Sequence, residues 1–206
     1  MALVLARKQR RDRVREATRD EILQAAWKLA REKGLAALTL RDLAEAVDMR
    51  APSLYSYFRS KHAIYDAMFA DGNQRLWEYV QEQPVGSDPR GRLRVWLGAF
   101  VRFCCDDPAL YQLLFQRTIP GFQPSEASMK LANRSLQWGR AVLVEADVHD
   151  PAASDLVTAV ISGLIAQQTA NEPGGDRWIR LTDSAIRMLF DYFDHTEGGS
   201  RRDSDD

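Results

Sequence analysis

Apolar residues recur at intervals of three and four positions along almost the whole of this 206-residue chain, and strand-like alternation is absent. The first such face is formed by Ile22, Leu23, Ala26, Leu29 and Ala30, in a helix that Gly34 ends. Proline and glycine separate the later segments, and we expect helices over about 89–105, 108–116, 125–147, 151–171 and 176–195. The sequence therefore predicts an all-α protein.

Two short helices joined by a tight turn are predicted within residues 39–58. Thr39 can cap the first helix, and Asp42 stands three positions on, as in an acidic variant of the capping box. After a turn at 48–50, Pro52 falls in the first turn of the second helix, where proline is well tolerated. Such a pair, following a longer helix, is the minimal unit that can place one helix in a DNA major groove.

The second short helix, over about 51–57, has two different faces. Leu54 and Phe58 give it an apolar inner face. The opposite face carries small and hydrogen-bonding side chains, namely Arg50, Ala51, Ser53, Ser56 and Tyr57. These could reach base edges and phosphates. Lys61, with the free amides after the predicted cap Ser60, offers phosphate a second site.

Charge is divided unevenly along the chain, although its formal total is only −1. Residues 1–62 contain 14 Lys and Arg against 8 Asp and Glu, a net +6, and residues 63–206 contain 14 against 21, a net −7. This indicates that only the first region meets a polyanion. The basic arm over 1–19 either enters a neighbouring minor groove, as in other helix-turn-helix proteins, or is a solvated tail.

Motifs at consistent spacing cover the first third of the chain. They are Ile22-Leu23-x-Ala25-Ala26, Gly34, Thr39-Leu40-Arg41-Asp42-Leu43-Ala44 and Ser53-Leu54-Tyr55-x-Tyr57-Phe58-x-Ser60-Lys61. These motifs resemble the DNA-binding domain of the TetR family of transcriptional regulators. The resemblance implies a three-helix helix-turn-helix domain over 20–62 and a helical ligand-binding and dimerisation domain over 63–195.

The same resemblance implies what the protein does. We expect a homodimer that binds a palindromic double-stranded operator, most simply as a repressor, and that a small-molecule effector releases. Thr39, Tyr55 and Lys61 match positions that contact phosphates in this family. Asp48 departs from the glycine usual in the turn, and Pro52 departs from the small residue usual at its position. Asp tolerates the left-handed conformation better than most residues.

Aromatic residues at helical spacing are frequent in the C-terminal region, and most are expected to pack in its core. A pocket between helices would be lined by some of them, with a few polar groups that orient a ligand. The candidate ligand-binding residues are Trp96, Phe100, Phe103, Tyr111, Phe115, Trp138 and Gln168. We expect an apolar or amphipathic effector; the alternative is that this region binds no small ligand.

The last two long helical segments are the expected dimer interface. They are adjacent in sequence and apolar at Leu156, Val160, Ile161, Leu164, Ile186, Leu189 and Phe190. The family resemblance implies that they form a four-helix interface with their symmetry mates. The residues from 196 to 206 have no hydrophobic content and are expected to form a disordered tail.

Other classes of function find no support. No Rossmann, P-loop or nucleophile-elbow pattern occurs, so neither an enzyme nor a cofactor is predicted. His62, His149 and His195 lie far apart, without metal-ligand spacing. No apolar run approaches the roughly 20 residues that cross a bilayer, and the start lacks the apolar core of a signal peptide, so we expect a cytoplasmic protein.

The two cysteines of the chain, Cys104 and Cys105, are neighbours in a helical pattern. They are most simply reduced core residues.

The alternative to a DNA-binding regulator is a helical ligand-binding or scaffolding protein whose N-terminal unit binds a protein partner. Salt dependence separates the two, because counterion release makes DNA affinity fall steeply with salt.

Overall fold

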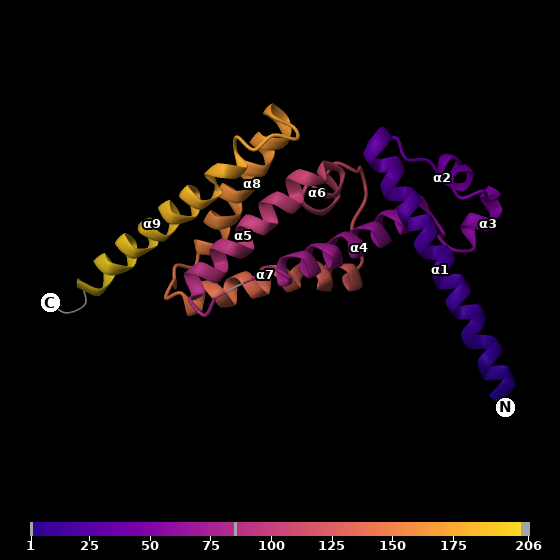
Figure 1. Ribbon diagram of the computed structural model, residues 1–206, viewed down its shortest axis with the longest axis horizontal. Helices are drawn as coiled ribbons and strands as arrows, with labels where there is room; N and C mark the ends of the chain where they lie inside the picture. Colours follow the sequence, from indigo (N-terminus) through magenta and orange to yellow (C-terminus); the bar gives the residue numbers. More distant parts are fainter. Residues whose placement is uncertain (1, 85, 203–206) are drawn as a thin grey trace. The chain divides into compact units, whose positions relative to one another are not determined.

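The computed structural model describes the backbone of residues 2–84 and 86–202, and the side chains of residues 7–84 and 86–196 (Figure 1). Within these residues the regular structure is helical, without a strand, which confirms the predicted all-α class. The helices are α1 (Ala2–Lys33), α2 (Leu40–Ala46), α3 (Ala51–Tyr55), α4 (Lys61–Gln81), α5 (Pro89–Asp106), α6 (Pro108–Phe115), α7 (Glu126–Glu145), α8 (Ala153–Asn171), the 3-10 helix η1 (Ile179–Leu181) and α9 (Thr182–Arg202).

The chain folds as two compact units. The first comprises Met1–Gly72 and Ala109–Ser128, and the second comprises Asn73–Pro108 and Met129–Asp206. The sequence predicts a boundary near residue 62, whereas the units divide within α4. The segment after α5 returns to the first unit, where a Cβ added at Gly72 would lie 3.2 Å from Leu114 Cδ2. This glycine therefore lets α6 approach α4 closely.

The core of the first unit is centred on Trp27, which is fully buried. Its indole Nε1 donates a hydrogen bond to Asp71 Oδ2 on α4, over 2.7 Å. Around it lie fully or almost fully buried side chains from α1 to α4, including Ile22, Leu38, Leu43, Leu54, Phe58, Ile64 and Met68. The helix-turn-helix thus packs on a hydrophobic core to which residues from α1 to α4 contribute.

Helix α1 includes residues 2–19, which the sequence analysis assigns to a basic N-terminal arm. No glycine or proline occurs before Gly34, and the helix runs without a break from Ala2 to Lys33. It ends where Gly34 adopts a φ of +86° and donates a backbone hydrogen bond to Ala30 O. Residues 2–19 of the basic segment therefore form the first part of a 32-residue helix.

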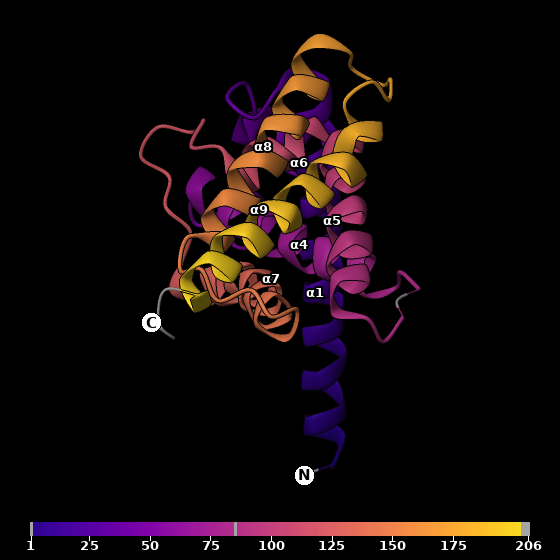
Figure 2. The same ribbon diagram turned by 90° about the vertical axis from the view of Figure 1, so that its left-hand side faces the viewer.

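In the second unit α5, α8 and α9 pack side by side (Figure 2). Ion pairs connect α5 to its neighbours at the surface: Arg90 and Arg94 pair with Asp194 and Asp183 of α9. The core between these helices contains Leu93, Leu97, Val101, Ile161, Ile165, Ile186, Leu189, Phe190 and Phe193.

This packing corrects the expected dimer face. Ile161, Ile186, Leu189 and Phe190 are between 2% and 9% exposed within the single chain, so they cannot supply an intermolecular surface. They face the core of their own unit because α5 packs against both α8 and α9. Leu156, Val160 and Leu164 are half-buried. The large apolar side chains that α9 and its preceding turn expose are instead Leu181, Met188 and Tyr192.

The C-terminal end also differs from expectation. Helix α9 continues to Arg202, into the segment from residue 196 that the sequence predicts to be a disordered tail. A helix already anchored by Phe193 and its neighbours can extend into polar sequence, since each added residue gains a backbone hydrogen bond. The remaining part of the predicted tail, 203–206, lies outside the described residues. None of the described helices is long and apolar enough to cross a membrane.

Candidate nucleic-acid interface

Helix α2 is fixed at both ends by capping interactions. At its start Thr39 Oγ1 accepts a hydrogen bond from Asp42 N over 3.1 Å, as predicted. At its end Met49 N donates to Ala44 O and Asp48 N donates to Glu45 O. This is the Schellman pair of hydrogen bonds, with Asp48 in the left-handed position at a φ of 50°. The predicted role of Asp48 is confirmed, and the turn sets the direction in which α3 begins.

Helix α3 presents one buried and one exposed face. Leu54 and Phe58 are each 1% exposed and hold the helix against the core, as the sequence predicts. The outward side carries Arg50, Ala51, Ser53, Tyr55 and Ser56, all exposed, whereas Tyr57 is half-buried. Ser56 Oγ donates to Ser53 O over 2.7 Å, which leaves its lone pairs free to accept.

Two arginines of α1 hold the C-terminal end of α3. Arg15 Nη2 donates to Ser56 O over 2.5 Å, and Arg19 Nη1 donates to Tyr57 O over 3.2 Å. The Arg19 guanidinium also lies over the Phe58 ring, 4.3 Å from its centroid. The last carbonyls of a helix have no intrahelical partner, so these cations satisfy groups that the five-residue helix leaves open.

Lys61 occupies a position that is only partly free. Its Nζ donates to Ala36 O over 3.1 Å and lies 5.5 Å from the centroid of the Tyr65 ring. Tyr65 in turn donates from its hydroxyl to Leu35 O over 2.6 Å. Ser60 caps α4 through a hydrogen bond from Ala63 N, as predicted. The start of α4 is thereby tied to the loop before α2, which places Thr39 near the same end of the unit.

The structure thus gathers the predicted residues into one helix-turn-helix, with a contribution that the sequence analysis missed. The spacing of Arg15 and Arg19, four residues apart on one helix, would have revealed their role only if α1 had been known to continue through them. Among the described residues, no three His, Cys, Asp or Glu side chains form a group that could hold a metal ion.

The candidate ligand-binding residues do not form one group. Trp96, Phe100 and Trp138 stack in the second unit, with centroids 5.6 Å apart for Trp96 and Phe100 and 5.2 Å apart for Trp96 and Trp138. Phe103 instead packs against Tyr79, at 5.2 Å. Tyr111 and Phe115 pack against each other in the first unit. The sequence could not separate these groups, because helical spacing says nothing of which helices meet.

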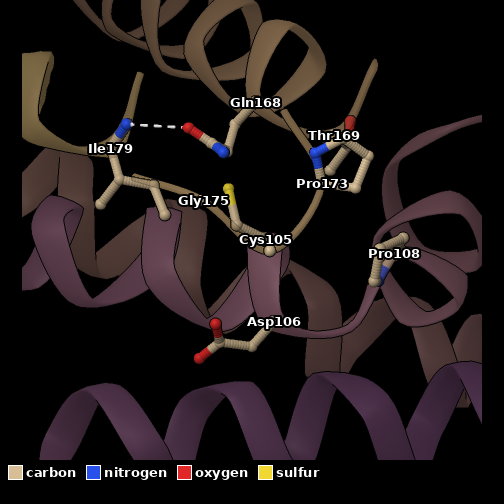
Figure 3. Close-up of a pocket in the computed structure, with 9 residues that line it drawn as sticks. Cys105, Asp106, Pro108, Gln168, Thr169, Pro173, Gly175 and Ile179 are labelled. Atoms are coloured by element: carbon tan, nitrogen blue, oxygen red, sulfur yellow. Dashed lines mark hydrogen bonds between the residues drawn. The ribbon is translucent and has the colours of Figure 1, made fainter. Parts of the chain in front are cut away.

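Gln168 lies in a separate small pocket of the second unit, beside Cys105 (Figure 3). Its Oε1 accepts hydrogen bonds from Trp178 N and Ile179 N, over 2.8 and 3.4 Å. The cavity holds about 60 Å³ and none of the aromatic candidates lines it. Sites for small molecules are typically roughly 300 Å³ or larger. Gln168 therefore holds the turn before η1, and its role in orienting a ligand stays a prediction.

Both cysteines are in the reduced form, and neither is poised to react. Cys104 is buried, and burial raises the pKa of its thiol well above the ordinary range. Burial also raises the pKa of the Cys105 thiol to about 11, helped by the nearby charge of Asp106. A thiol is nucleophilic only as the thiolate. The Cys105 thiol beside the pocket is consequently a weak nucleophile.

Comparison with known proteins links this geometry to a family. The family described as "Bacterial regulatory proteins, tetR family" matches residues 22–68, which include α2, α3 and the start of α4. A segment of 76 residues is 38% identical to the HTH-type transcriptional repressor KstR2 of Mycolicibacterium smegmatis. That segment spans 36% of this chain and 37% of the repressor.

Solved structures share the fold over most of the chain. A TetR family transcriptional regulator, PfmR from Thermus thermophilus, is 24% identical with a TM-score of 0.63, covering 82% of this chain and 96% of that one. The transcriptional regulator FadR from Bacillus subtilis, solved in complex with stearoyl-CoA, is 17% identical with a TM-score of 0.59, covering 82% and 95%. The matched family consists of regulatory proteins rather than enzymes, as the sequence leads us to expect. The family match thus covers the helix-turn-helix, and the solved structures share the all-helical fold of most of the chain.

Proposed function

We propose that this protein is a cytoplasmic transcriptional regulator, a repressor in the simplest case, that binds a palindromic operator as a homodimer and is released by a small apolar or amphipathic effector. The observation that carries the proposal is the two-faced α3. Its inner side is locked by Leu54 and Phe58, its end is held by Arg15 and Arg19, and its outer side is free. A rigid helix with an open polar face is what direct reading of a major groove requires.

The charge distribution supports DNA as the partner. The first 62 residues carry a net charge of +6 on a chain whose total is −1. DNA phosphates are neutralised by such a surface with release of counterions, so affinity should fall steeply as salt rises.

The DNA surface is tested with variants of its exposed side chains. We expect Arg50→Ala and Tyr55→Ala each to weaken operator binding about 10-fold or more at fixed salt, because a good base or phosphate contact contributes roughly 1–3 kcal/mol. Arg180→Ala removes the same charge from an exposed position in the second unit and should have no effect. Fluorescence anisotropy with a labelled operator measures all three. Unchanged affinity in both α3 variants would refute this placement of the DNA surface.

The dimer is proposed to form through an exposed face of α8 and α9. Leu181, Met188 and Tyr192 are 42% to 58% exposed, and their spacing of seven and four residues places them on one side. Exposed Ala159 and Gly163 on α8 would let a partner backbone approach closely. Such a patch of large apolar side chains marks an interaction surface.

Sedimentation of matched variants tests this interface. Met188→Glu should shift the protein toward monomer, whereas Met129→Glu, at an exposed methionine of α7 outside this face, should leave the dimer intact. A dimer unaffected by Met188→Glu would place the interface elsewhere.

An amphipathic acyl thioester is our first choice of effector to test. FadR from Bacillus subtilis, which shares the fold, was solved with stearoyl-CoA. In the second unit of this chain the stacked Trp96 offers a buried Nε1 that has no acceptor among the described residues. A ligand carbonyl could accept from it after the rings of Phe100 and Trp138 part.

The regulatory step is proposed to act through α4. Two recognition helices of a dimer must lie about 34 to 36 Å apart to enter successive major grooves. Helix α4 follows α3 after residues 56–60 and continues into the second unit, so an effector that favours a different α4 orientation would change that spacing. Linkage then weakens DNA binding, typically by about 1–3 kcal/mol. Stearoyl-CoA should quench tryptophan fluorescence and lower operator affinity about 5- to 150-fold; no change in either would exclude this ligand class.

A further inference from the structure

The N-terminal half of α1 concentrates its positive charge on one side. At roughly 100° per residue, Arg7, Lys8, Arg11, Arg15 and Arg19 fall within an arc of about 120°. The acidic Asp12 and Glu16 lie outside that arc, and Arg10 and Arg13 lie on the other side of the helix. All five are exposed, and we call the N-terminal three, Arg7, Lys8 and Arg11, the α1 stripe.

The α1 stripe is continuous with the recognition helix. Arg15 and Arg19, which complete the same arc, hold the Ser56 and Tyr57 carbonyls at the end of α3. Toward the N-terminus each residue adds about 1.5 Å, so the stripe extends roughly 12 Å from Arg15 to Arg7. Within the first unit, α1 projects past α2 and α3 in this direction (Figure 1).

The protein itself does not explain this arrangement. Arg7, Lys8 and Arg11 are exposed, and none forms an ion pair with a described residue. Like charges spaced by four residues, as at Arg7, Arg11 and Arg15, destabilise a helix. This repulsion is unfavourable in the free protein and is relieved when a polyanion binds.

We propose that the α1 stripe binds the phosphate backbone of DNA beside the groove that α3 enters, as a rigid helix rather than a flexible arm. This inference rests on the proposed DNA-binding function. Phosphate contacts carry no base sequence, so the stripe adds affinity and fixes the orientation of the domain, while α3 supplies specificity.

Salt dependence gives the proposal a quantitative signature. Each phosphate contact contributes about 0.9 to the steepness of the fall of log affinity with log salt concentration. A fourfold rise in salt therefore lowers the affinity about 3.5-fold for each contact. A double variant removes two contacts from each protomer and four from the dimer, and should therefore reduce the slope by about 3.6. Between 50 and 200 mM salt, the wild type should lose about 150-fold more affinity than such a variant.

The test compares two double variants of equal charge in the full-length protein. Arg7→Gln with Arg11→Gln alters the stripe, and Arg10→Gln with Arg13→Gln alters the other side of the same turns. Gln has nearly the helix propensity of Arg, and circular dichroism confirms that helix content is kept. We expect only the stripe variant to show weaker operator binding and the reduced slope.

The outcomes separate this inference from the function on which it rests. Equal losses in both double variants would mean that charge acts without regard to the helix face, as in a flexible arm, and would overturn the proposal. No loss in either would make the stripe a solvated surface and would also overturn it, with the DNA-binding function intact. Wild-type protein that selects and binds no DNA would instead refute the proposed function.

Discussion

Arg15 of α1 donates a hydrogen bond to the carbonyl oxygen of Ser56, at the end of α3, over 2.5 Å and across 41 positions of sequence. A helix of five residues is too short to be stable by itself in water. Its conformation therefore depends on the core beneath it, on the turn before it and on the arginines that satisfy its last carbonyls.

Loss of the neighbouring arginine should loosen α3. Arg19→Met keeps a long side chain over Phe58 but loses the hydrogen bond to Tyr57 O. We expect a fall of about 1 kcal/mol in the free energy of unfolding, measured by urea denaturation, because the bond is solvent-exposed. DNA affinity should also fall. Arg10→Met is the control. Equal free energies of unfolding in the two variants would show that the hydrogen bond from Arg19 to Tyr57 O contributes nothing.

The turn between α2 and α3 should respond to the backbone at Asp48. Its φ of 50° is unfavourable for most side chains and free of strain for glycine. Asp48→Gly should stabilise the protein by about 0.5–1 kcal/mol, and Asp48→Val should destabilise it by about 1–2 kcal/mol. Thermal and urea unfolding at one protein concentration would check both. The opposite order would mean that the carboxylate, not the backbone, stabilises this turn.

The cysteines should be nearly inert in the folded protein. With the pKa of Cys105 raised to about 11 by burial, only a very small fraction is thiolate at pH 8. Labelling by a thiol-specific disulfide reagent should be at least about 100-fold slower than for an exposed thiol of ordinary pKa. Both thiols should react at once in denaturant. Rapid labelling of the folded protein would indicate an open, reactive site beside Gln168.

The surface pair Arg90–Asp194 should give a small, pH-dependent stabilisation. The hydrogen bond from Arg90 lowers the pKa of the Asp194 carboxyl, so the contribution exists above the carboxyl's unfolded value and is lost as the pH falls through the lower folded value, below about 4. Asp194→Asn should cost less than about 1 kcal/mol at pH 7, since both groups are exposed. The difference from wild type should shrink as the pH falls below about 4. A difference that does not change with pH would show that the pair acts through packing alone.

Local signals predicted the helix-turn-helix well. Thr39 and Ser60 cap helices through their own hydroxyls, Asp48 adopts the left-handed conformation, and Leu54 and Phe58 are spaced to face one side. Each of these features is decided within a few residues, so the sequence pattern contains the necessary information.

Features decided by packing between distant segments were less predictable. Ile161 and Ile186 have the same apolar character as an interface residue, and only the position of α5 assigns them to the internal core. Tyr111 and Trp96 are both aromatic residues at helical spacing in the C-terminal region. Tyr111 nevertheless belongs to the first unit, because α6 folds as part of that unit. The hydrogen bonds from Arg15 and Arg19 to the end of α3 likewise join residues about 40 positions apart in the sequence.

Selection of bound fragments from the source genome, at two salt concentrations and followed by footprinting, tests the central claim most directly. The account predicts an enriched palindrome with two protected half-sites about one helical turn apart, and weaker enrichment at the higher salt. Failure to enrich any sequence at either concentration, with folded dimeric protein, would contradict it and would favour a protein partner for the helix-turn-helix.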